Sequence, residues 1–117
     1  MSGQVSYLAG LSAEDIVARR YEDAGRRIVA RRWRGTSGEV DLIAKDGEGF
    51  IFIEVKKSRS HRQAAARLSR CQMNRIYGSA SEFLSGQPNG QNTDTRFDVA
   101  LVDAGGAVAL VENAIGF

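Results

Sequence analysis

Gly-Glu-Val-Asp-Leu-Ile-Ala at residues 38–44 and Phe-Ile-Phe-Ile-Glu-Val-Lys at residues 50–56 are the stretches that decide the fold. Both read as β-strands, yet they carry three charged side chains, Asp41, Glu54 and Lys56. A charge in an apolar strand is costly unless it is paired or binds a metal ion. Residues two apart on a strand point to the same face, so Glu54 and Lys56 stand side by side, and Asp41 could face them from the preceding strand. Two carboxylates and an ammonium at one place can bind a divalent cation and activate water against a phosphodiester.

Further strands and helices are expected around this pair. Ser12 is a typical helix N-cap and Gly25 a typical stop, so the first helix is predicted to run to Ala24. Apolar patterning predicts a second helix and five strands in all. The strands are expected at residues 28–33, 39–44, 50–55, 96–102 and 107–111, and the second helix at 63–84. The order α-β-β-β-α-β-β indicates an α/β fold, with a central mixed sheet flanked by helices.

Length and composition restrict the class of protein. The chain has 117 residues, which suits a single domain over residues 1–117. No apolar run reaches the roughly 20 residues that span a bilayer, and the N-terminus lacks the pattern of a signal peptide. The single cysteine, Cys71, excludes an internal disulfide and a cysteine-cluster zinc site. A cytoplasmic protein without a membrane partner is the simplest expectation.

The basic residues are concentrated in two stretches. Residues 19–34 contain seven arginines against two acids, and residues 56–75 contain seven Lys or Arg and no acid. Arginine, which makes forked contacts with phosphate, accounts for all but three of the basic residues. Such stretches can be solvated helix faces, but two of them around an acidic cluster favour a phosphate-rich partner.

Four motifs in order along the chain carry a resemblance. They are Glu14, Gly-Glu-Val-Asp at 38–41, Glu-Val-Lys at 54–56 and Arg-Phe-Asp-Val at 96–99. Together they resemble the YraN/UPF0102 family of small bacterial proteins and, more broadly, the PD-(D/E)xK nuclease superfamily. The resemblance implies a single nuclease-like domain with a restriction-endonuclease-like core. It also implies a metal-dependent endonuclease acting on DNA, with a branched or partly single-stranded substrate as one expectation.

The resemblance also implies roles for individual residues. Asp41 and Glu54 would be metal ligands, the backbone carbonyl of Val55 a further one, and Glu14 an auxiliary ligand. Mg²⁺ suits such an all-oxygen set, with Mn²⁺ as a substitute. Lys56 would orient the attacking water or stabilise charge on the phosphate. Its ammonium is expected to stay charged beside two carboxylates, which makes simple general-base action less credible.

Other residues have weaker assignments. Glu39 shares the strand face of Asp41, so it is either a site residue that supports the metal ligands or a charge at the strand start. Relatives often carry Thr-Arg directly after the motif lysine, whereas here the arginine is one residue further on. The residues expected to bind nucleic acid are Lys57, Arg59, Arg62 and Arg67.

Three polar residues in the second half of the chain have structural interpretations. Gln72 and Tyr77 resemble a Gln-x-x-x-Tyr element of some related nucleases, but their spacing is one residue longer, so no role is carried over. Asp98 stands in an otherwise apolar strand and is expected to anchor a neighbouring loop.

Two other functions stay open from the sequence. The basic stretches alone would suffice for a nucleic-acid-binding accessory factor without cleavage. The chain could also be an interaction subunit of a larger DNA-processing complex. Asp41, Glu54 and Lys56 would then form a structural ion-pair cluster. A homodimer is compatible with the chain, although no coiled-coil pattern specifies one.

Overall fold

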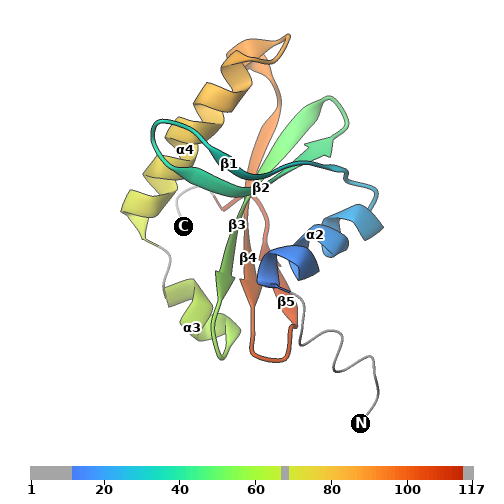
Figure 1. The fold of residues 1–117 in the computed structure, drawn as a ribbon, viewed down its shortest axis with the longest axis vertical. Coiled ribbons are helices and arrows are strands. Elements are labelled where there is room, and N and C mark those ends of the chain that lie inside the picture. Colours follow the sequence, from blue (N-terminus) through green and yellow to red (C-terminus); the bar gives the residue numbers. More distant parts are fainter. Residues whose placement is uncertain (1–11, 67–68, 115–117) are drawn as a thin grey trace.

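A five-stranded mixed sheet with helices on both faces forms the core of the protein (Figure 1). The computed structural model describes residues 12–66 and 69–114. The elements are α2 (Ala13–Asp23), β1 (Ile28–Arg34), β2 (Glu39–Asp46), β3 (Gly49–Lys57), α3 (His61–Ala66), α4 (Arg70–Ser85), the 3-10 helix η1 (Gly90–Asn92), β4 (Thr95–Val102) and β5 (Val108–Val111). The predicted α/β class is confirmed, and the arrangement is compatible with a nuclease-like core.

The strands lie in the order β1-β2-β3-β4-β5. The pairs β1–β2, β2–β3 and β4–β5 are antiparallel, whereas β3 and β4 are parallel, with Phe50 opposite Thr95. A parallel pair needs a crossover connection, which the segment containing α3 and α4 supplies. The strand that carries Glu54 is therefore central and has a neighbour on each side.

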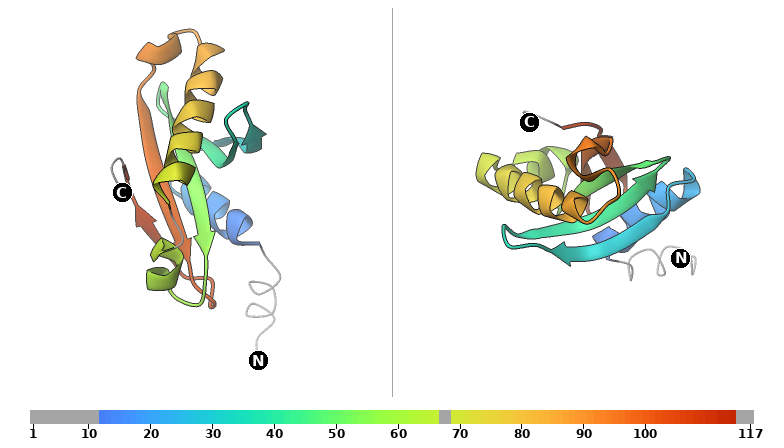
Figure 2. Two further views of the ribbon diagram at one scale, coloured as in Figure 1. Left: turned by 90° about the vertical axis from the view of Figure 1, so that its left-hand side faces the viewer. Right: turned by 90° about the horizontal axis from the view of Figure 1, so that it is seen from above.

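Each face of the sheet has its own apolar core. Figure 2 shows the helices that cover the two faces. Helix α2 covers one face, and its Val17 and Tyr21 pack against Leu42 and Ile53. Helices α3 and α4 cover the other face, where Met73 and Ile76 of α4 join a cluster with side chains of β2, β3 and β4. Burial on both faces explains why β3 is an apolar run interrupted only by its charged C-terminal half.

The predicted single helix over 63–84 is wrong, because the structure has two helices there. Ser69 is extended, with φ −115° and ψ 156°, and its hydroxyl accepts a hydrogen bond from the backbone N–H of Gln72 at 3.1 Å. Ser60 caps α3 in the same way through the N–H of Gln63. Serine followed three residues later by glutamine is a capping signal that the continuous apolar spacing obscured. Residues 67 and 68 lie outside the described part.

The first helix and the strand ends follow the sequence more closely. Ser12 caps α2 through the N–H of Asp15, and Gly25 follows the helix with φ +81°, a conformation that strains other residues. Strand β2 continues to Asp46 and β3 to Lys57, each two residues beyond the predicted ends at 44 and 55. None of the helices within 12–66 and 69–114 is long and apolar enough to cross a membrane.

Asp98 is the anchor that the sequence predicted. It is 2% exposed and accepts hydrogen bonds from Tyr21 Oη at 2.6 Å and from the backbone N–H of Asn113 at 3.0 Å. Arg96 donates to both of its oxygens at 2.8 Å. Burial and the adjacent Asp98 carboxylate raise the pKa of Tyr21. These bonds join α2, β4 and the segment after β5.

Candidate active site

The turn between β1 and β2 is fixed to α4, and this sets where β2 begins. Glu82 of α4 accepts hydrogen bonds from the N–H of Thr36 at 2.8 Å and from its hydroxyl at 3.0 Å. Ser79, which is fully buried, donates to the carbonyl of Gly38 at 2.8 Å. The start of β2 is therefore held against the second half of α4, and the candidate site lies between β2 and this helix.

Asp41 and Glu54 lie on adjacent antiparallel strands. Because Leu42 pairs with Ile53, the next position on each strand places Asp41 beside Glu54. Asp41 Oδ2 accepts a hydrogen bond from the backbone N–H of Val55 at 2.8 Å. The structure thus brings the two predicted carboxylates together.

Glu54 has two partners that converge on one of its oxygens. Its Oε1 accepts a hydrogen bond from Gln72 Nε2 at 2.6 Å and lies 3.2 Å from Lys56 Nζ. Lys56 therefore stands beside Glu54, as the strand periodicity predicts. The contact with Gln72 was not predicted, because its pattern in the sequence was interpreted as structural. The Ser69 cap, which sets the start of α4, was the signal that could have placed Gln72 in the first turn of a helix.

The two carboxyl groups are held at an electrostatic cost. Burial raises the pKa of Asp41, and the N–H of Val55 only partly opposes this, while the charges of Glu14 and Glu39 add to it. Burial and the negative charge of Asp41 raise the pKa of Glu54 to about 7, although Lys56 acts in the opposite direction. Two partly desolvated carboxylates at close range favour a shared proton or a cation between them.

A cleft of about 270 Å³ opens at this pair. Its lining residues are Gly38, Glu39, Asp41, Glu54, Gln72, Arg75 and Ile76. Glu39 therefore belongs to the cleft, where its carboxylate accepts a hydrogen bond from Arg34 at 3.2 Å. Arg75 was not singled out in the sequence, and it brings a cation to the wall that α4 forms.

Glu14 lies near the pair but is engaged elsewhere. Its Oε2 accepts a hydrogen bond from Arg32 Nε at 3.0 Å, and it does not line the cleft. Among residues 12–66 and 69–114, the structure has no group of three or more histidine, cysteine, aspartate or glutamate side chains placed to hold a metal ion. Glu14 as an auxiliary ligand stays a prediction.

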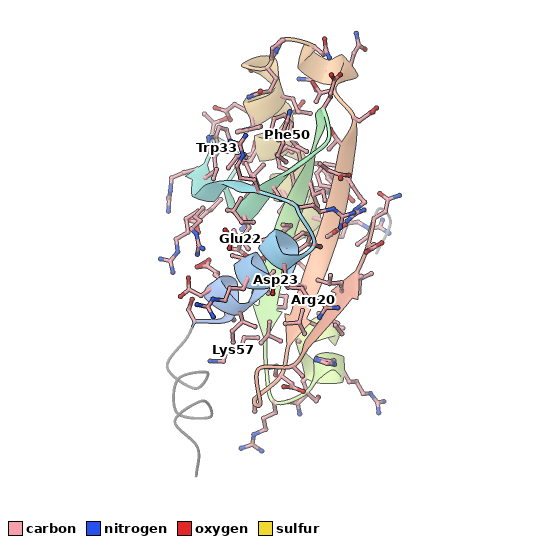
Figure 3. All side chains as sticks on the ribbon, turned by 90° about the vertical axis from the view of Figure 1, so that its right-hand side faces the viewer. Arg20, Glu22, Asp23, Trp33, Phe50 and Lys57 are labelled. Atoms are coloured by element: carbon pink, nitrogen blue, oxygen red, sulfur yellow. The ribbon has the colours of Figure 1, made fainter. Side chains whose placement is uncertain are left out.

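The residues predicted to bind nucleic acid lie around the end of β3. Lys57 ends this strand, at the opposite end from Phe50 (Figure 3), and Arg59 and Arg62 follow it. All three are exposed, whereas Arg67 lies outside the described residues.

Comparisons with known proteins agree on one family. The family model described as uncharacterised protein family UPF0102 matches residues 13–102. A UPF0102 protein of Cereibacter sphaeroides is 68% identical over 97% of this chain and 97% of its own length. A UPF0102 protein of Ruegeria pomeroyi is 51% identical over 97% of this chain and 93% of its own. One from Dinoroseobacter shibae is 41% identical over 95% and 83%.

Proposed function

The chain belongs to the uncharacterised protein family UPF0102, and on that premise we propose that it is a metal-dependent endonuclease of the PD-(D/E)xK type, hydrolysing phosphodiester bonds in DNA. One observation carries the proposal. Asp41 and Glu54 stand side by side in a cleft, with Lys56 in contact with Glu54 and with both carboxyl pKa values raised. A purely structural cluster would be expected to lower these pKa values through its ion pairs.

The donor set fits a hard divalent cation. The hydrogen bonds from Val55 and Gln72 use one oxygen of each carboxylate, Asp41 Oδ2 and Glu54 Oε1. The other oxygen of each is the one to be offered to a cation, together with the carbonyl of Val55. Mg²⁺, with Mn²⁺ as substitute, matches such oxygen ligands and would cancel the like charges. When bound, the cation would polarise the phosphate and lower the pKa of water.

The neighbouring side chains have separate roles in this proposal. Gln72 holds Glu54 in one rotamer and leaves its second oxygen turned to the cleft. Lys56, anchored on Glu54, orients the water nucleophile or stabilises charge that develops on the phosphate. Glu39, already paired with Arg34, supports the negative potential that attracts a cation.

The substrate in this proposal is DNA with a branched or partly single-stranded structure. No element that reads base sequence in the major groove was recognised in the chain, so the cleft would act on backbone shape rather than on sequence. The cytoplasm is the proposed site of this activity. A homodimer or a protein partner would provide a second contact with a branched substrate.

The test compares cleavage by matched carboxylate variants. Asp41→Asn and Glu54→Gln should each lower Mg²⁺-dependent cleavage of branched DNA at least about 10³-fold, because each removes charge that holds the cation. Asp46→Asn is the control, since Asp46 lies on β2 but is on the surface, paired with Arg26. Calorimetric titration with Mn²⁺ should show binding in the wild type and in Asp46→Asn and none in the other two variants.

Two results would overturn the nuclease proposal. Equal cleavage by the wild type and Asp41→Asn would place the chemistry elsewhere. DNA binding without metal-dependent turnover in any variant would instead favour the non-catalytic accessory factor. The second possibility has support in the exposed arginines beyond β3, which would bind phosphate whether or not the cleft is active.

A further inference from the structure

Arg75 stands in an acidic cleft but forms no ion pair with the carboxylates that line it. It lines the same cleft as Glu39, Asp41 and Glu54. Glu39 is paired with Arg34 and Glu54 with Lys56, yet Arg75 has no ion pair with any residue in 12–66 and 69–114. The cleft thus holds a guanidinium that makes no ion pair with the part of the protein that the structure describes.

The stem of Arg75 is held in place by its packing against Gly38. A Cβ added at Gly38 would lie 3.3 Å from the Cβ of Arg75 and 3.8 Å from its Cδ, so the side chain runs over the bare glycine backbone. Ser79, one turn further along α4, fixes the same glycine through its carbonyl. The position of the stem is therefore set before any ligand arrives, which lowers the entropy lost when the guanidinium binds.

Arg75 and Gln72 lie three residues apart on α4, which places them on the same side of the helix. Gln72 contacts the protein carboxylate Glu54, whereas Arg75 forms no ion pair with any residue of the described ranges. The helix thus presents one polar side chain to the carboxylate pair and one charged side chain to whatever enters the cleft. A guanidinium prefers planar, forked contact with the oxygens of a phosphate or carboxylate.

We propose that Arg75 is the phosphate-binding residue of this cleft and that it contacts the phosphodiester lying next to Asp41 and Glu54. This inference rests on the proposed function, because it takes a phosphodiester as the ligand. Arg75 then positions the substrate and does not exchange a proton with it. The repulsion between a phosphodiester and the two carboxylates is offset on one side by the cation and on the other by Arg75.

The experiment measures binding separately from cleavage. Labelled branched DNA is titrated with the full chain at several NaCl concentrations. Ca²⁺ replaces Mg²⁺ in these titrations because it also binds oxygen ligands, and a parallel sample checks whether the DNA is hydrolysed. Arg75→Ala should weaken binding by about tenfold and reduce the salt slope by about one, as expected for one lost phosphate contact. Arg75→Lys should retain the salt slope while recovering only part of the affinity. With Mg²⁺, Arg75→Ala should raise KM more than it lowers kcat.

The controls separate a contact with DNA from a change of fold. Arg20→Ala removes an exposed arginine of α2, on the other face of the sheet, that does not line the cleft, and it should leave the KM-against-kcat split unchanged. Thermal unfolding of Arg75→Ala should match the wild type. An affinity, salt slope and KM equal to those of the wild type in Arg75→Ala would overturn the inference, as would a wild type that does not bind DNA. Arg75-dependent binding by a wild type that never cleaves would overturn the nuclease proposal and leave this inference standing.

Discussion

The β1 side of the molecule (residues 19–34) and the α4 side (residues 56–75) each carry seven basic residues, but these residues differ in their ion pairs. On the β1 side four arginines are paired with acids: Arg26 with Asp46, Arg31 with Asp15, Arg32 with Glu14 and Arg34 with Glu39, at 2.8 to 3.4 Å. On the α4 side the exposed arginines Arg59, Arg62, Arg70 and Arg75 form no ion pair within the described residues. The pairs on the first side are exposed, so each contributes little to stability.

The difference shows that an arginine-rich stretch does not by itself define a binding surface. Both stretches look equally suited to phosphate in the sequence, but neighbouring acids occupy much of the first. The second stretch begins at the end of β3, and its Arg75 lines the cleft that also contains Asp41 and Glu54. Arginines without an ion pair are available to an anionic ligand, and carboxylates without full compensation are available to a cation.

The largest expected effect on DNA binding comes from removing arginines on the α4 side rather than on the β1 side. Replacing Arg59, Arg62 and Arg70 together with alanine should weaken DNA binding about 100-fold and lower the salt slope by about two to three, because three phosphate contacts are lost. The matched variant replaces Arg26, Arg31 and Arg34. It should change the affinity less than about threefold, because those side chains already have anionic partners.

Fluorescence anisotropy at several salt concentrations measures both quantities. The two sides would not differ in DNA binding if the β1-side variant lost as much affinity as the α4-side variant. Circular dichroism of both variants checks that the fold is retained.

The next effect concerns the stability of the metal-free protein. The pKa of Glu54 rises from its ordinary value of 4.5 to about 7 in the folded state. The folded state therefore binds more protons than the unfolded state in this range, and the free energy of unfolding falls as pH rises from about 4.5 to 7. Glu54→Gln should leave stability nearly unchanged at pH 5 and increase it by roughly 1–3 kcal/mol at pH 8.

Urea unfolding in EDTA at the two pH values measures this difference. Asp46→Asn, a surface carboxylate on β2, should show no comparable gain at pH 8. A Glu54→Gln variant that is less stable than the wild type at pH 8 would mean that Lys56 and Gln72 outweigh the cost of burial, and the α4 side would then resemble the β1 side.

The smallest effect concerns Gln72. Gln72→Ala removes the hydrogen bond to Glu54 Oε1 that favours the ionised carboxylate. We expect cleavage to fall by about tenfold at pH 7 and the acidic limb of the pH–rate profile to move to higher pH. Asn74→Ala, an exposed polar residue on the same helix, is the control and should not move the profile. A uniform loss of rate at every pH would show that Gln72 acts on something other than the protonation of Glu54.

Local patterns predicted the strands and the carboxylate pair well. The alternation around Asp41 and Glu54 placed both on neighbouring strands, and the register confirms it. The first helix, which Ser12 caps, was also predicted closely. These features depend on residues near one another in the chain, so the sequence contains enough information for them.

Contacts between distant segments were not predictable in the same way. Gln72 and Arg75 reach the cleft because the β1–β2 turn docks on α4, and no local pattern announces that docking. The break between α3 and α4 was missed because apolar spacing continues across Ser69. The acids that pair with the arginines of the β1 side come from two other elements, α2 and β2. Only the fold therefore reveals that much of that stretch is neutralised.

The parallel pairing of β3 with β4 has a consequence for the order of folding. Strands β1, β2 and β3 are joined by short turns and can pair through local contacts, so Asp41 and Glu54 acquire their spacing at little loop-closure cost. The pairing of Phe50 with Thr95, by contrast, closes a long loop that contains α3 and α4. Topologies with such long-range pairings fold more slowly than local ones. We therefore expect the carboxylate pair to form before the transition state and the β3–β4 junction to form late, so that substitutions in β4 change the refolding rate less than they change the unfolding rate.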